Sequence, residues 1–117
     1  MGVWRDGGGV LTVTARAGEA AGGGVSRGAP VAVPLEIAGS YGTRRRGLLG
    51  RDGIEGALLL TPCGSVHTFG MRFAIDVAYL DRRMRVLRVQ TLRPGRMPLP
   101  RPRARHVLEA EAGAMAG

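Results

Sequence analysis

A chain of 117 residues has the length of one small domain, and its hydrophobic share of 44% is enough for a single core. The net charge of +8 comes from seventeen basic residues, all of them arginine, against nine acidic ones, so an anionic partner has to be considered. The single cysteine excludes an internal disulfide. Because no apolar run reaches about 18 residues, a transmembrane helix is excluded as well.

The first 32 residues predict a hairpin and a linker. Apolar and polar residues alternate within residues 3–15, and Asp6-Gly7 is a typical turn pair, so a short hairpin is expected there. Residues 16–30 are rich in glycine and have no hydrophobic period, which predicts a partly ordered linker. We therefore expect the main domain to begin at residue 33.

The next stretch predicts a strand followed by a short helix. Residues 31–40 are mostly apolar and β-branched, and Pro34 suggests an edge strand or the start of a strand. Ser40 or Thr43 can cap a helix over residues 43–51. So short a helix needs packing against the rest of the protein to be stable.

The remaining segments predict mainly strands. Residues 56–62 form an apolar run too short for a core helix, hence a buried strand. Large apolar residues alternate with smaller or polar ones over residues 67–81, which predicts a strand, and residues 84–92 would return as its hairpin partner. The proline- and arginine-rich residues 93–105 should be extended on the surface. Residues 106–113 predict a last strand or a short helix.

Four blocks of the sequence resemble the DUF192 family, also called UPF0127. They are RRRGLLGR at 44–51, GALLL at 56–60, FAIDVAYLD at 73–81 and ARHVLEAEAG at 104–113. The resemblance covers about residues 33–117. It implies an α+β, β-rich fold: a curved, mostly antiparallel sheet, or partial barrel, with one or two short helices. It implies no chemistry, because the family's function is unassigned and a fold alone does not supply one.

The chain departs from the family pattern at two places. VHTFGM at 66–71 stands where relatives have Phe-Trp-Met-Lys-Asn-Thr, which indicates a divergent subgroup. Relatives usually continue beyond the final Ala-Gly with another strand, so we expect a truncated C-terminus. Members of the family are often exported, but the start of this chain lacks the pattern of a signal peptide, so the expected location is cytoplasmic.

Cys63, His67 and Met71 form the first candidate site. Thiolate, imidazole and thioether are soft or borderline ligands, so copper(I) or another soft metal is a candidate cofactor. A Cys63–His67 catalytic pair would need the two side chains within hydrogen-bond reach. A strand would instead hold residues four positions apart at about 13 Å. We therefore predict no catalytic residue, and an enzyme is not the favoured class.

Asp76 is the centre of the second candidate site. It interrupts an apolar strand, and a buried carboxylate needs a partner. Arg46, Arg51 and Arg72 are the candidates for a bidentate ion pair. The same four residues, together with His67, are also candidates for lining a pocket for a small polar ligand.

Three functions remain open from the sequence. The leading hypothesis is a non-enzymatic accessory protein that binds a partner protein or a small polar ligand. The second is binding of a soft metal or small ligand through Cys63, His67, Met71 and Asp76. The third is polyanion binding by the arginines. The arginine-rich segment has no interleaved aromatic residue to stack on bases, so nucleic acid is a less favoured partner.

Overall fold

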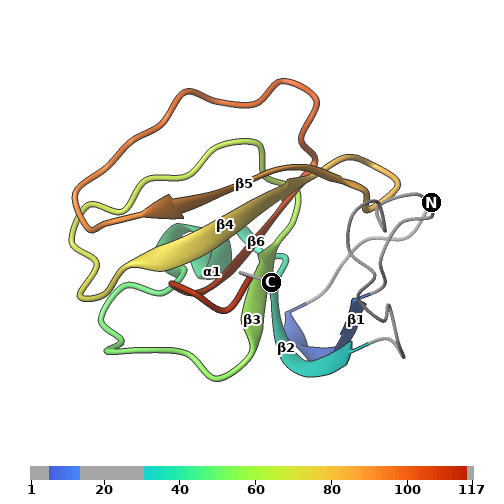
Figure 1. Ribbon diagram of the computed structural model, residues 1–117, viewed down its shortest axis with the longest axis horizontal. Helices are drawn as coiled ribbons and strands as arrows, with labels where there is room; N and C mark the ends of the chain where they lie inside the picture. The colour runs from blue at the N-terminus through green and yellow to red at the C-terminus, as the bar shows by residue number, and fades with distance from the viewer. Residues whose placement is uncertain (1–5, 14–30, 116–117) are drawn as a thin grey trace, which may run out of the picture.

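The computed structural model describes residues 6–13 and 31–115, which form a six-stranded sheet and one short helix (Figure 1). The elements are β1 (Gly7–Val13), β2 (Val31–Ala38), α1 (Tyr41–Arg46), β3 (Ala57–Leu60), β4 (Ile75–Leu80), β5 (Val86–Leu92) and β6 (His106–Glu111). The strand order is β1-β2-β3-β6-β4-β5, and only the β2–β3 pair is parallel. The sheet is open, with β1 and β5 at its edges. The expected β-rich fold with a mostly antiparallel sheet is confirmed.

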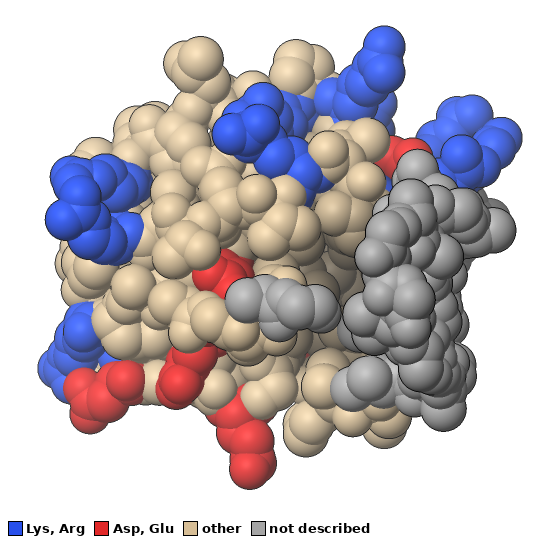
Figure 2. Space-filling view, viewed as in Figure 1, with Lys and Arg blue, Asp and Glu red and all other residues tan. Residues whose placement is uncertain are grey.

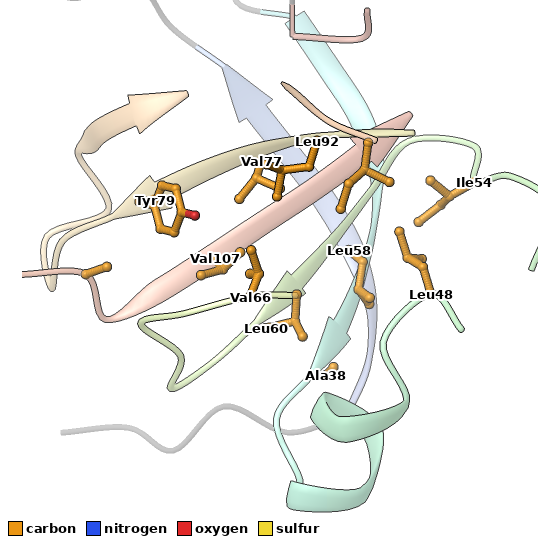
Figure 3. Close-up of a cluster of buried hydrophobic side chains, with 12 residues drawn as sticks. Ala38, Leu48, Ile54, Leu58, Leu60, Val66, Val77, Tyr79, Leu92 and Val107 are labelled. Atoms are coloured by element: carbon orange, nitrogen blue, oxygen red, sulfur yellow. The ribbon is translucent and has the colours of Figure 1, made fainter. Parts of the chain in front are cut away.

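The central strands carry apolar side chains on both faces of the sheet. On the face toward α1, called the helix face, Leu58, Val77 and Val107 belong to one buried cluster (Figure 3). On the opposite face, Leu59 and Ala78 belong to a second buried cluster. Because both faces of the sheet are covered at β4, all six of its residues are buried, and burial does not alternate along this strand.

The helix begins where the sequence predicted a cap and ends earlier than expected. The Ser40 side chain accepts a hydrogen bond from the Thr43 amide at 3.3 Å, so the Ser40 cap is confirmed. The last helical residue is Arg46, because Gly47 leaves the helical conformation with φ 49° and ψ −127°. No helix among the described residues is long and apolar enough to cross a membrane.

Asp6, one of the two residues of the predicted hairpin turn, is hydrogen-bonded to the segment that begins α1, and residues 3–5, which would complete that turn, lie outside the described residues. The Oδ1 of Asp6 accepts hydrogen bonds from the amides of Gly39 and Ser40 at 2.7 and 2.9 Å, and from the Thr43 hydroxyl at 2.7 Å. These bonds, that of Thr43 above all, hold the pKa of Asp6 well below its usual value. Asp6 therefore ties the start of β1 to the start of α1. The rest of the predicted hairpin and the linker falls largely outside the described residues.

The predicted strand over residues 67–81 is wrong in its first half, since β4 begins only at Ile75. The preceding residues form a loop held by Thr68, whose amide donates to the Arg96 carbonyl at 2.7 Å. The Thr68 hydroxyl donates to the Arg93 carbonyl at 2.7 Å and accepts from the Arg96 amide at 2.8 Å. These bonds join the loop to residues 93–105, which arch beside it (Figure 1). Such long-range bonds leave no trace in local alternation.

The other strand predictions are confirmed with small differences. β3, β5 and β6 fall inside the three predicted segments, and the last of them is a strand and not a helix. Pro34 lies in β2, which is internal, so the edge-strand interpretation is wrong. It is the fourth residue of β2 and so does not stand at the start of the strand either, but it precedes Leu35, where the pairing with β3 begins.

Candidate functional site

A hollow of about 320 Å³ opens between α1 and β2. Its charged lining residues are Asp6, Glu36, Arg46 and Arg51, and Gly47 lines it as well. Asp6 precedes β1 and Glu36 lies in β2, whereas the other three residues belong to the end of α1 and the turns after it. Leu58 of β3 also lines it, so the hollow gathers residues from four separate segments.

The charges of the hollow are only partly neutralised. Arg51 donates two hydrogen bonds of 2.8 Å to the two carboxylate oxygens of Glu36, a bidentate pair. These bonds lower the pKa of Glu36 and raise that of Arg51. Asp6 is occupied by the cap of α1. The Arg46 guanidinium has no acceptor among the described residues, so it is free to meet an anion.

Glu109 lies in the core beside this hollow. It sits in β6 on the helix face, between Leu58 of β3 and Val77 of β4, and is only 5% exposed. Burial raises the pKa of its carboxyl to about 7. Within residues 6–13 and 31–115 no group donates a hydrogen bond to it. The position that a Cβ at Gly47 would take is 4.0 Å from Glu109 Oε1, so the carboxyl lies next to a residue that lines the hollow.

Neither Arg44 nor Cys63 donates a hydrogen bond to Glu109. The Arg44 guanidinium donates to the carbonyls of Gly39 and Thr61 at 2.8 and 3.3 Å. The Cys63 thiol donates to the Ser65 carbonyl at 3.1 Å. Burial raises the pKa of Cys63, and the charge of Glu109 raises it further while Arg44 lowers it. The thiol is thus held in its protonated form, which is a poor nucleophile.

Asp76 is on the opposite face of the sheet and has no arginine partner. Its Oδ1 accepts from the Thr91 hydroxyl at 2.6 Å, and its Oδ2 accepts from the amides of Gly113 and Met115 at 2.9 and 3.0 Å. Burial opposes ionisation, but these hydrogen bonds outweigh it, so the pKa of Asp76 lies below its usual value. Asp76 fastens the turn that follows β6 to β4 and β5.

The predicted ion pair between Asp76 and an arginine is therefore wrong. Arg51 pairs with Glu36, and Arg72 pairs with Asp52 at 3.3 Å on the surface. A bidentate arginine pair does exist, but its carboxylate belongs to β2. Of the predicted pocket residues, Arg46 and Arg51 meet in the hollow, whereas Asp76 and Arg72 do not line it.

The three predicted metal ligands lie in different environments. His67 is exposed and stacks on Phe69 with ring centroids 5.4 Å apart. Cys63 and Met71 instead pack against the core cluster of the helix face. The described ranges contain no group of three His, Cys, Asp or Glu side chains that could hold a metal ion. Soft-metal binding stays a prediction.

Glu109 was missed by the sequence reasoning, although a signal for it existed. It is a charged residue between Leu108 and Ala110 in a segment predicted to be a strand or helix, and it belongs to one of the blocks that resemble DUF192. An acidic residue inside an apolar run marks a carboxyl that the fold has to bury. The same rule was applied only to Asp76.

Comparison with known proteins assigns the chain to a family. The DUF192 family, described as "Uncharacterized ACR", matches residues 24–117. A UPF0127 protein of Pyrococcus horikoshii is 34% identical over 84 residues, covering 68% of this chain and 73% of the relative. A UPF0127 protein of Pyrococcus abyssi is 32% identical over 84 residues, covering 68% and 72%. No solved structure matches the chain. The chain therefore belongs to the DUF192 (UPF0127) family.

Proposed function

We propose that this protein binds a small polar ligand in the hollow between α1 and β2. The ligand carries an acidic group and a hydrogen-bond donor, as amino acids and hydroxy acids do. The observation that carries the proposal is Glu109, a buried carboxyl without a donor in the described part of the chain, which lies beside a hollow and is separated from it by a glycine.

The chemistry of the ligand follows from the groups left without partners. A carboxyl that is only 5% exposed and has no hydrogen-bond donor among the described residues is costly to ionise, and a donor on the ligand would lower that cost. At the mouth of the hollow, Arg46 offers a free guanidinium to an acidic group. Asp6 and the Glu36–Arg51 pair are already occupied, so they shape the rim and add little affinity.

The size of the hollow favours a small molecule over a protein segment. Its volume of about 320 Å³ is at the lower end of the range of about 300–1,000 Å³ that is usual for small-ligand pockets. A molecule of amino-acid size, with an acidic group for Arg46 and a hydrogen-bond donor for Glu109, suits a hollow of this volume. This geometry supports recognition of both ends of one small molecule.

The test is a titration of the isotopically labelled protein with a panel of free amino acids and hydroxy acids, followed by NMR. A binding compound should shift the amide signals of Arg46, Gly47 and Arg51. Glu109→Gln and Arg46→Ala should each weaken that binding about ten-fold, the loss of one charge-assisted hydrogen bond.

Arg45→Ala is the matched control for Arg46→Ala. Arg45 is the neighbouring residue on the same helix, is exposed, and does not line the hollow, and its replacement removes the same charge. Equal weakening by the two variants would show only a general charge effect and contradict the proposal. So would a panel that leaves the signals around Gly47 unmoved.

A further inference from the structure

A second hollow of about 320 Å³ lies at the other end of the sheet, and its lining consists of arginines and a single acid. Arg82, Arg83 and Arg85 come from the β4–β5 turn, and Arg103 and Arg105 come from the end of the loop before β6. Basic side chains gather over this turn at the upper right of the molecule (Figure 2).

The backbone that carries these arginines is held in place by hydrogen bonds. Oδ1 of Asp81 accepts from the amides of Arg83 and Arg85 at 2.8 and 2.9 Å, which closes the turn. The Arg105 amide donates to the Leu80 carbonyl at 2.8 Å and so docks the second loop beside the first. The Arg105 side chain donates to the Pro102 carbonyl at 2.9 Å. The arginines thus project from a preorganised frame.

The positive charge of this hollow is not compensated by the described part of the chain. Five guanidinium groups and one carboxylate leave a charge of +4 (five minus one). The carboxylate, Asp81, already serves the backbone of the turn. The described residues form two side-chain ion pairs, Arg51–Glu36 and Arg72–Asp52, and neither involves this cluster. Like charges gathered around one hollow repel one another, and an anion would relieve that repulsion.

We propose that this arginine hollow binds a small ligand through two or more linked phosphate groups. Guanidinium forks match phosphate oxygens in bidentate geometry, and several of them around one concave site suit a multiply charged group better than a single carboxylate. The lining has no aromatic ring on which a base could stack, which argues against single-stranded nucleic acid as the natural ligand. This site is distinct from the hollow beside Glu109 and does not depend on it.

The test uses inorganic pyrophosphate as the probe, with calorimetry and thermal unfolding of the whole chain at about 0.05 M ionic strength, where screening is weak. Pyrophosphate should bind and raise Tm. Arg83→Ala and Arg103→Ala should each weaken binding about ten-fold. Both side chains are exposed and donate no hydrogen bond to the described residues, so these variants should fold. Arg45→Ala removes the same charge from a residue that does not line this hollow, so it should leave the affinity for pyrophosphate unchanged.

Three outcomes would overturn the proposal. The first is absence of pyrophosphate binding at low salt. The second is equal weakening by Arg45→Ala, which would indicate a diffuse attraction of anions by the whole protein. The third is a single-stranded oligothymidylate that binds more tightly than pyrophosphate and loses affinity equally in all three variants, which would make the arginines a nucleic-acid surface.

Discussion

Asp76 and Glu109 are two buried acids in paired strands of one sheet, on opposite faces, and the protein treats them differently. Asp76, on the face away from α1, is 3% exposed and accepts three hydrogen bonds. Glu109 is 5% exposed on the helix face and accepts none from the described residues. Hydrogen bonds lower the pKa of Asp76, whereas burial raises that of Glu109 to about 7, so near neutral pH Asp76 is ionised and Glu109 is still partly protonated.

This difference separates a structural acid from a candidate binding group. The three donors around Asp76 come from the turn after β6 and from β5, so its carboxylate holds the end of the chain against the sheet. Glu109 makes no such connection and weakens the fold when it ionises. A buried polar group that the fold does not use is a better candidate for meeting a ligand than one the fold depends on.

The largest effect is expected from Asp76→Ala. It removes three charge-assisted hydrogen bonds worth about 1.5–3 kcal/mol each, which are not fully additive, so the free energy of unfolding should fall by about 4 kcal/mol. Urea unfolding of the variant and the parent at neutral pH measures this difference in the free energy of unfolding. Thr91→Val removes only one of the three donors and should cost about 1 kcal/mol. A loss below about 1 kcal/mol for Asp76→Ala would contradict the structural role of this carboxylate.

Glu109→Gln should have a smaller effect that depends on pH. Below about pH 4.5 the Glu109 carboxyl is protonated in both the folded and the unfolded chain. Between pH 4.5 and about 7 it ionises only in the unfolded chain, so the parent protein loses stability as pH rises. Raising the pKa of this carboxyl from 4.5 to about 7 corresponds to about 3 kcal/mol. The variant should therefore gain about 3 kcal/mol over the parent between pH 4 and pH 8.

His106 titrates in the same range and has to be accounted for. Burial lowers its pKa, so its contribution to stability is lost as pH falls, opposite in direction to that of Glu109. Because His106 is present in both proteins, its contribution cancels in the difference between them. A difference that stays constant from pH 4 to pH 8 would show that Glu109 is ionised in the folded protein and has an undetected partner.

Gly47→Ala tests whether the turn after α1 needs glycine. The φ of 49° with ψ −127° is unfavourable for any residue with a Cβ, so the variant should lose about 2 kcal/mol. Gly42→Ala is the control, because it lies within α1 with open space around its Cβ position, and alanine should stabilise the helix by about 0.5–1 kcal/mol. If Gly47→Ala costs no more than a few tenths of a kcal/mol, this turn does not need glycine.

The sequence predicted the sheet better than it predicted the site, for a physical reason. Apolar runs bounded by turn residues identify strands locally, as at residues 56–62 and 84–92. The site depends on pairing between distant segments, since β3 meets β6 and brings Leu58 beside Glu109. The partners of Asp76 are mostly backbone amides, which no residue type reveals. The alternation over residues 67–74 misled for the same reason. The conformation of this loop is set by the long-range hydrogen bonds of Thr68 and not by the local pattern.

The smallest effect concerns Glu36, a third acid in the same row of the helix face as Glu109 but at its open end. Its pair with Arg51 is bidentate, yet the two side chains are 46% and 40% exposed. A double-mutant cycle of Glu36→Gln and Arg51→Gln should therefore give a coupling of only about 0.5 kcal/mol, reduced further at about 1 M salt. A coupling above about 2 kcal/mol would mean that water is excluded from the rim. The pair would then act as a buried ion pair that holds β2 to the segment after α1, and not as an exposed contact at the rim.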